Sequence, residues 1–339
     1  MNSRLVALGA VGLLMLGACL RPTQPAPAAS NASTAIRAAT QAWLASLRAE
    51  QSTLARVAID AEERTRWAFV PGERAGLRLS QMDAAQRSQA LAIITALLSV
   101  EGARQVQGVI ELEALLHSKS PGSYDPDWYD WLVFGDPAQG SFGLRIEGHH
   151  LSVQWMTDGR AASFTPWFIG AAPFQTANGY APLGRERELG FALWNQLSES
   201  ERAAARIAAD APGDVTGIPG ADLSVLKQRR GLSMDRMSPA AKAAFRALLE
   251  QHALRLQGPF AQEERQRLLA EAEEELCLIW AGSDAPEGRH YWCLRGSFFA
   301  IEFDCTSSTD HVHHVWHDFE RDHGNALRAH LAARPHTTR

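Results

Sequence analysis

The sequence predicts an α+β protein built from two related halves, each with helices packed on an antiparallel β-meander. In each half, helical periodicity comes first, and short strand-like stretches separated by turns follow it. The halves also resemble each other in residues, since 79–83 resemble 234–238 and 148–155 resemble 296–303. These identities are few, and shared amphipathic patterning can also produce them, so an internal duplication is a hypothesis here.

Residues 1–18 have the features of a secretory signal peptide. Arg4 supplies a basic start, residues 5–16 form a short apolar run, and small residues follow. The run is too short to span a bilayer. Prolines come soon afterwards, which argues against the alternative of a buried N-terminal helix.

Cys19 follows a Leu-Gly-Ala step that resembles the bacterial lipobox, in which the cysteine is lipidated and becomes the mature N-terminus. The resemblance implies that the membrane is a partner of the protein through lipidated Cys19. Residues 19–34 are rich in Pro, Ala and Ser and are expected to form a tether. Leu20 stands where sorting to the inner membrane would require aspartate, which implies the outer membrane, facing the periplasm.

The rest of the chain is divided into residues 35–178 and 179–335, which we expect to form one compact domain. With 46% hydrophobic residues and ten tryptophans, the chain can bury a substantial core. The formal net charge of -5 and the isolated basic pair at 229–230 provide no basic surface, so no nucleic-acid partner is expected.

The spacing of apolar residues in the first half predicts helices at residues 35–57, 83–97 and 101–116. Asp83 and Gln86 form a capping box at the start of the second of these helices. Strand patterns bounded by turn residues predict strands at 130–134, 141–147, 150–156 and 162–167.

In the second half, Ser198 with Glu201 and Ser238 with Pro239 mark two helix starts. Further helices are expected at residues 260–274 and 322–331, and strands at 276–280, 290–294, 298–303 and 311–316.

The three cysteines of the second half raise the question of a disulfide. A symmetric closure of the loop at 282–288 would place Cys277 opposite Cys293, which predicts a disulfide between them and leaves Cys305 free. The alternative is a pair of small buried side chains on one face of the sheet.

The candidate site lies near the C-terminus. His311 and His313 form an H-x-H step, and on a strand this spacing puts both imidazoles on one face. Glu302 and Asp304 have the same spacing on the preceding strand. We expect a register in which Asp304 faces His311 and Glu302 faces His313.

A third ligand is needed because two imidazoles hold a metal weakly. Residues 295–298 are expected to form a two-residue hairpin with Gly296 at its first central position. In the equivalent turn of the first half, His149 would lie at the tip and His150 on the strand. His150 is therefore the expected third ligand, whereas His314 and His317 are expected at the surface.

His150, His311 and His313 predict a site for zinc or another divalent transition metal, with one position open for water. Glu302 would act as general base toward that water, or orient a ligand. The favoured function is a metal-dependent, hydrolytic envelope enzyme that acts on a small-molecule or envelope substrate. The alternatives are a non-catalytic lipoprotein that binds a metal or ligand, and, for the H-x-H step, two ordinary strand histidines.

Several motifs occur in collinear order over nearly the whole mature chain: Trp67-x-Phe69-x-Pro71, Arg74-x-Gly76, Phe134-Gly135-x-Pro137, Gly148-His149-His150-Leu151, Trp280-Ala281-Gly282, Ile301-Glu302-Phe303-Asp304 and His311-x-His313. Together they resemble a bacterial domain-of-unknown-function family numbered 3500. The resemblance implies no reaction, because the family has no established one. His317 and Cys293 stand where the family commonly has arginine, and residues 322–324 replace an acidic-aromatic-glycine step, so a role that needs a guanidinium is in doubt.

Overall fold

The computed structural model describes residues 27–159 and 161–325, and in this part of the chain the strands form one 13-stranded sheet. The strand order is β1-β3-β4-β5-β7-β13-β12-β11-β10-β8, with β2 on β3, β6 on β5 and β9 on β10. The strands are β1 Arg56–Val57, β2 Leu77–Arg78, β3 Asp130–Gly135, β4 Phe142–Gly148, β5 Leu151–Thr157, β6 Ala162–Ser163, β7 Trp167–Ala171, β8 Arg206–Ala208, β9 Leu232–Ser233, β10 Cys277–Gly282, β11 His290–Arg295, β12 Phe299–Ser308 and β13 His311–Asp318.

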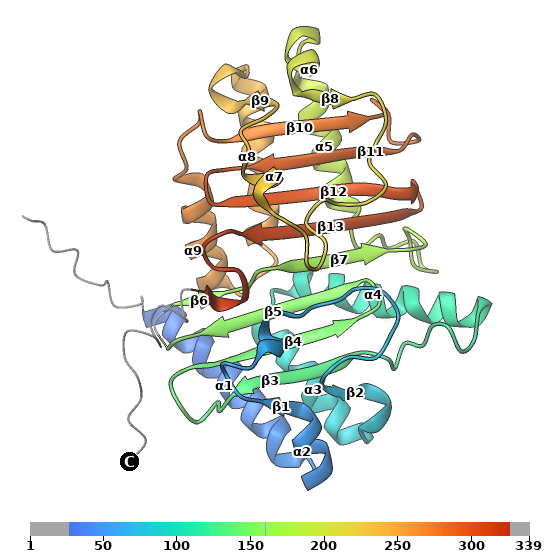
Figure 1. Cartoon of the computed structure of the whole chain (residues 1–339), viewed down its shortest axis with the longest axis vertical. Coiled ribbons are helices and arrows are strands. Elements are labelled where there is room, and N and C mark those ends of the chain that lie inside the picture. Colours follow the sequence, from blue (N-terminus) through green and yellow to red (C-terminus); the bar gives the residue numbers. More distant parts are fainter. Residues whose placement is uncertain (1–26, 160, 326–339) are drawn as a thin grey trace, which may run out of the picture.

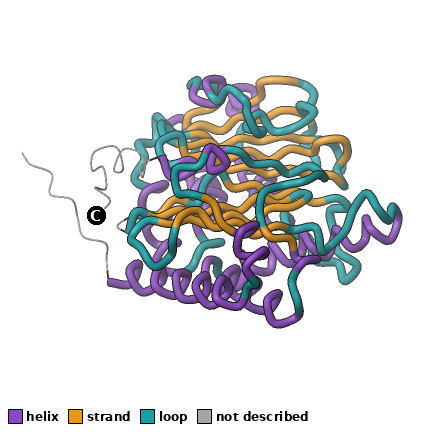
Figure 2. Tube along the Cα trace, turned by 60° about the horizontal axis from the view of Figure 1, so that its bottom comes forward, coloured by secondary structure: helices purple, strands orange, loops and turns teal. Residues whose placement is uncertain are grey.

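Helices cover one face of this sheet, and two long loop segments cross the other face (Figure 1). We call residues 58–76, between β1 and β2, the first covering segment and residues 209–231, between β8 and β9, the second covering segment. Figure 2 shows the strands lying between the helical layer and these loops. The helices are α1 Pro27–Ser46, α2 Ala49–Ala55, α3 Ala84–Leu97, α4 Val100–Lys119, α5 Gly184–Gln196, α6 Glu199–Ala205, α7 Ser224–Lys227, α8 Pro239–Ala253 and α9 Gly258–Leu269.

These elements confirm the predicted α+β class. The expected strands of both meanders form, except that residues 162–167 divide between β6 and the start of β7. The helix expected at 35–57 is two helices, α1 and α2, and α1 begins inside the range expected for the tether. Helix α5 was not predicted. Of the helix expected at 322–331, the described part of the chain contains only residues 322–325, which form the 3₁₀ turn Asp322–Gly324 and its cap Asn325.

The elements of the second half repeat the order of the first. Each half has two helices, a short strand parallel to its neighbour, a covering segment, a short antiparallel strand with a 3₁₀ turn, two helices and a meander. The halves meet where β7 pairs with β13 in the middle of the sheet. An internal duplication would give this arrangement, but the duplication itself stays a hypothesis.

The helix starts follow from the capping residues of the sequence. Asp83 accepts a hydrogen bond from the backbone of Gln86 at 2.9 Å, and Ser198 and Ser238 cap α6 and α8 in the same way. The apolar faces of the helices then pack on the sheet in one core that contains residues of both halves. Its largest fully buried side chains are Trp43, Trp131, Trp155, Trp167, Trp194, Trp280, Trp292 and Trp316.

Two hairpins are each centred one residue later than predicted. The β4–β5 turn is closed by the pair Gly148 and Leu151, so His149 and His150 both lie in the turn. The β11–β12 turn is closed by Gly296, whose backbone donates to Phe299 at 3.0 Å. A shift of the centre by one residue moves every cross-strand partner by two positions and leaves each side chain on its face.

The same kind of shift excludes the predicted disulfide. Gly282 pairs with His290, so Cys277 lies opposite Arg295 and Cys293 lies opposite Ile279. The two cysteines are diagonal neighbours on one face, where the separation is too large for a disulfide. Cys277, Cys293 and Cys305 are all buried and free, as the alternative interpretation required.

Among the described residues, no helix is both long enough and apolar enough to cross a membrane. The predicted signal peptide and Cys19 lie outside the described residues.

Candidate metal centre

The H-x-H step lies on β13, the strand through which the second half joins the first. His313 hydrogen-bonds toward the second covering segment, whereas His314 contacts His252 of α8 on the helical side. His311 shares the face of His313 because the strand alternates. The prediction that the two imidazoles lie on one face is therefore confirmed.

His314 and His317 are buried, so the expectation that they lie at the surface was wrong. Strand β13 is central and is covered on both faces, by α8 on one side and by the second covering segment on the other. His314 lies 3.0 Å from His252 between the ring nitrogens, and His317 lies 2.9 Å from the carbonyl oxygen of Gly217.

His150 reaches the same place from the β4–β5 turn, and not from a strand as predicted. It has a left-handed backbone conformation with φ 59°, which non-glycine residues rarely adopt. Its backbone is fixed on both sides: its N–H donates to Phe69 at 2.8 Å, and its carbonyl accepts from Gly170 at 2.7 Å. Such sparsely populated conformations are concentrated at functional sites.

Gly170 on β7 provides the space in which the rings meet. It pairs with His313 across the β7–β13 ladder. A Cβ atom at this position would lie 2.7 Å from the His150 ring and 3.0 Å from the His313 ring. Any larger residue would therefore push the two imidazoles apart.

The three imidazoles converge on one point. Nε2 of His311 lies 3.1 Å from Nε2 of His150 and 3.0 Å from Nε2 of His313. The possible ligand atoms of all three residues lie within 4.8 Å of one another. Zinc–nitrogen bonds of about 2.0–2.1 Å need nitrogens roughly 3–4 Å apart, so this group can hold a metal ion.

The electrostatic environment keeps two of these imidazoles, those of His150 and His311, neutral. Burial lowers the pKa of His150 well below its ordinary value, and the neighbouring histidines add to this effect. Burial, followed by His313 and His149, lowers the pKa of His311 to about 4. At neutral pH both residues therefore present the unprotonated form that binds metals.

Polar groups behind the rings orient them. Asp214 of the second covering segment lies 2.6 Å from Nδ1 of His313, and Ser307 lies 3.1 Å from Nδ1 of His311. A carboxylate only accepts, so Nδ1 of His313 carries the proton and Nε2 presents its lone pair toward the other histidines. His149 stacks on His150 with ring centroids 3.8 Å apart.

The comparison with family models gives one match: the family described as a protein of unknown function (DUF3500) matches residues 29–325. The chain belongs to this family. The resemblance inferred from the short motifs is thus confirmed over most of the sequence. No curated protein and no solved structure matches the chain.

In this DUF3500 protein, Glu302 is buried on the same face as the histidines but one strand away from them. It lies opposite Val315, while Asp304 lies opposite His313, so the predicted register was wrong by two positions. A bulge between Cys305 and Ser308 displaces the end of the ladder further.

The hydrogen bonds described for Glu302 go to Thr216, Gly217 and Tyr291, and none goes to the three histidines. Asp214, which the sequence did not single out, is the carboxylate that contacts the site. No periodic signal marks Asp214, because it lies in a long loop 97 residues before His311 in the sequence.

The site is apolar on one side and open on another. Phe69 and Phe168 stack at 4.0 Å between ring centroids, and both lie edge-on to His313 at 5.1 and 5.2 Å. By contrast, His311 is partly exposed, and 35% of the Asp214 side chain is accessible. An ion held here would be reached from the side of His311 and Asp214.

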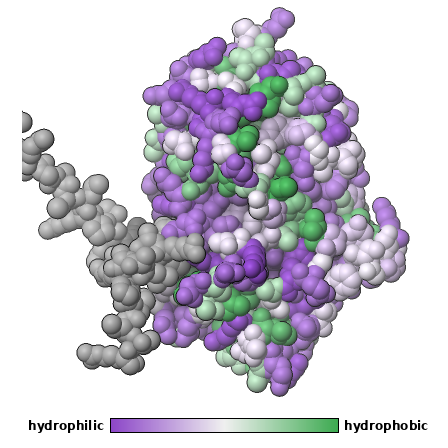
Figure 3. Space-filling model, in the orientation of Figure 1, coloured by the Kyte–Doolittle hydropathy of each residue, from purple (hydrophilic) through white to green (hydrophobic). Residues whose placement is uncertain are grey.

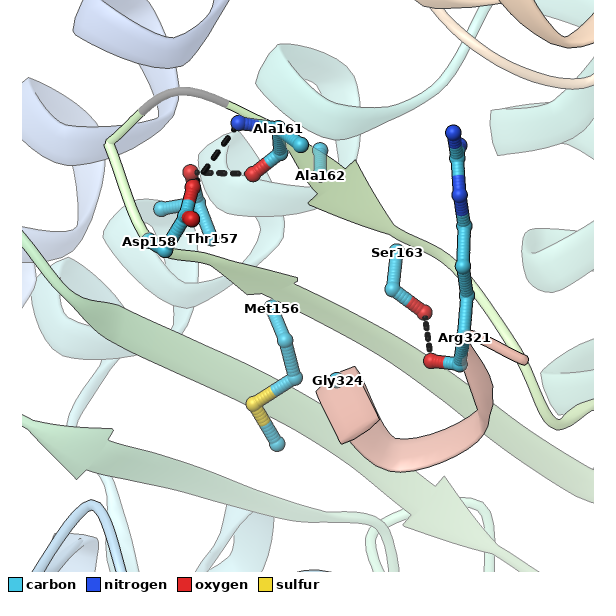
Figure 4. A pocket seen from close by; sticks show the side chains of 8 residues that line it. All are labelled: Met156, Thr157, Asp158, Ala161, Ala162, Ser163, Arg321 and Gly324. Carbon is cyan, nitrogen blue, oxygen red and sulfur yellow. Dashed lines mark hydrogen bonds between the residues drawn. The ribbon is translucent and has the colours of Figure 1, made fainter. Parts of the chain in front are cut away.

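Among the described residues, hollows of the DUF3500 protein also lie away from the three histidines. One, shown in Figure 4, lies among β5, β6 and the 3₁₀ turn and includes Met156 and Arg321. Another, of about 340 Å³, lies beside the first covering segment and includes Arg74 and Glu147. On the loop-covered face seen in Figure 3, hydrophobic and hydrophilic residues are interspersed.

Proposed function

We propose that this protein is a metal-dependent, hydrolytic enzyme of the cell envelope whose ion is held by His150, His311 and His313. The observation that carries the proposal is the convergence of three imidazole nitrogens at 3.0 and 3.1 Å. They come from both halves of the sheet, as a binding site between the halves requires. Imidazoles of this kind favour zinc or another divalent transition metal.

Zinc held by three histidines keeps a fourth position for water and lowers the pKa of that water to near neutrality. The residues around the site suit this chemistry. Asp214 orients His313, Ser307 contacts His311, and the phenylalanines exclude water from one side. The partly exposed side leaves room for a small-molecule or envelope substrate to approach.

We further propose that the enzyme is anchored by lipidated Cys19 in the outer membrane, facing the periplasm. The lipobox-like step before Cys19 and the Pro-rich residues after it support this location.

A non-catalytic metal-binding lipoprotein is the second candidate. It is favoured by the aromatic cover over His313, whose side chain is only 5% exposed, because this cover restricts the approach of a bulky substrate. The two candidates share the metal and differ in turnover.

The test is elemental analysis of the mature domain purified without a histidine tag. We expect one transition-metal ion per chain in the wild type and none in His313→Ala. His117→Ala is the matched control, because His117 is also partly buried but lies on α4 outside the site. A metal-free wild type that stays empty after dialysis against zinc would contradict the proposal.

Turnover is then measured with p-nitrophenyl esters and phosphodiesters on the metal-loaded protein. Hydrolysis that is lost with a chelator and restored by zinc supports the enzyme. Stoichiometric metal without hydrolysis of either ester class favours the non-catalytic candidate.

A further inference from the structure

Glu302 holds the second covering segment in place. Its side chain is fully buried. Its Oε1 accepts from the backbone N–H of Thr216 at 2.7 Å and from the hydroxyl of Tyr291 at 2.8 Å. Its Oε2 accepts from the N–H of Gly217 at 2.8 Å. Hydrogen bonds from backbone N–H groups to a buried carboxylate are strong, so they fix the position of this loop.

The fixed part of the loop lies directly beside the residue that contacts the metal site. Asp214 precedes Thr216 by two positions, and Val215 between them packs in one apolar cluster with Phe168. Gly217 comes so close to β13 and β12 that a Cβ atom there would lie 2.6 Å from the His317 ring. The loop therefore has little freedom between Gly217 and Asp214.

We propose that Glu302 is a positioning residue of the metal centre: it fixes residues 214–217 so that Asp214 sets the tautomer and orientation of His313. The inference rests on the proposed metal function. Of the two roles expected from the sequence, it assigns to Glu302 that of orienting a ligand. Three donors already occupy its two oxygens, which leaves the role of general base without support.

The first half contains a corresponding arrangement. Glu147 is buried, and its Oε1 accepts from the N–H of Ala68 and from the hydroxyl of Ser152, both at 2.9 Å. The next residue, Phe69, accepts the backbone hydrogen bond of His150 at 2.8 Å. In each half, a buried glutamate thus anchors a covering segment next to the residue that contacts a metal ligand.

The test begins with Glu302→Gln, which keeps the size of the side chain but leaves one oxygen to accept from two backbone N–H groups. We expect zinc affinity, measured by competition with a chelator, to fall about 10–100-fold, as is typical for residues that orient ligands. Glu264→Gln is the matched control: Glu264 is also buried but pairs with Arg321 on the helical side, so affinity should not change.

Two further readouts separate positioning from a general structural role. In the metal-free protein, ¹⁵N NMR of His313 should show a proton on Nδ1 in the wild type and a mixture of tautomers in Glu302→Gln. In a double-mutant cycle, Asp214→Asn combined with Glu302→Gln should bind zinc within about twofold of the weaker single variant, because both act through one contact.

Each outcome supports or contradicts the role of Glu302 as a positioning residue, even if Glu302→Gln does not fold. Unchanged zinc affinity and an unchanged His313 tautomer in Glu302→Gln would overturn this role. It would also be overturned if the losses of zinc affinity in the two single variants multiplied in the double variant. If Glu302→Gln does not fold, Gly217→Ala serves instead: its methyl group displaces the loop from His317, and the same loss of the Nδ1 tautomer is expected. A wild type that binds no zinc refutes the proposed function, whereas the tautomer measurement still decides the role of Glu302.

Discussion

Replacing Asp304 by asparagine is expected to remove much of the pH dependence of folding stability. Asp304 lies fully buried on β12, directly opposite His313. Burial raises the pKa of its carboxyl from 3.8 to about 8, with Arg289 opposing the shift and Asp214 adding to it. The folded state therefore binds this proton more tightly than the unfolded chain does.

The sign and the size follow from this difference in pKa. Between pH 4 and 8, the folded protein keeps a proton that the unfolded chain has lost, so stability falls as pH rises. Each pH unit in this window costs about 1.4 kcal/mol. From pH 5 to pH 8, the wild type should lose about 4 kcal/mol relative to Asp304→Asn, whose side chain does not titrate.

The assay is urea unfolding of both proteins at pH 5 and pH 8 after removal of metal with a chelator. Histidines of the unfolded chain also titrate in this range, but both proteins contain the same histidines, so this contribution is common to both. Equal changes of unfolding free energy in the two proteins would show that Asp304 is solvated or paired with a cation in the folded state.

Three shorter predictions concern the site, the anchor and the thiols. Gly170→Ala should abolish stoichiometric zinc in elemental analysis without removing a ligand, because its methyl group meets the His150 ring; normal zinc content would refute the packing argument. Cys19→Ala should move the protein from the membrane to the soluble fraction, and a correctly processed variant that stays membrane-bound would exclude the lipid anchor. Alkylation of the denatured, unreduced protein should modify Cys277, Cys293 and Cys305, whereas a protected pair would restore the disulfide.

The sequence predicted the sheet face on which a side chain lies better than it predicted the residue opposite to it on the next strand. The H-x-H period determines that His311 and His313 share a face, whatever the register, because strand alternation is local. Cross-strand partners depend on the residue at which each loop closes. The loops are centred one residue away from the predicted position, so Cys277 does not lie opposite Cys293, and Asp304 lies opposite His313. Loop closure is decided by the whole meander, so no local pattern reveals it.

Other parts of the site were beyond the reach of sequence patterns. His150 lies beside the H-x-H pair, as predicted, but it reaches the pair from a turn and not from a strand, and its left-handed conformation is unusual for a non-glycine residue. Asp214 has no periodic signal in its loop. The burial of His314 and His317 follows from layers that pack on both faces of β13, which a strand pattern alone does not specify.

Because the candidate ligands come from both halves, a bound ion would join them across β7 and β13. Such an ion would bind the folded state only, so zinc at 100 times its dissociation constant should raise the free energy of unfolding by about 2.7 kcal/mol. Calorimetry should then show an increase of the melting temperature of roughly 5 °C for a domain of this size. His150→Ala removes the ligand of the first half and leaves His311 and His313, which hold zinc only weakly. Equal stabilisation of wild type and His150→Ala by zinc would mean that the ion does not bridge the halves, and the site would then reduce to the H-x-H pair.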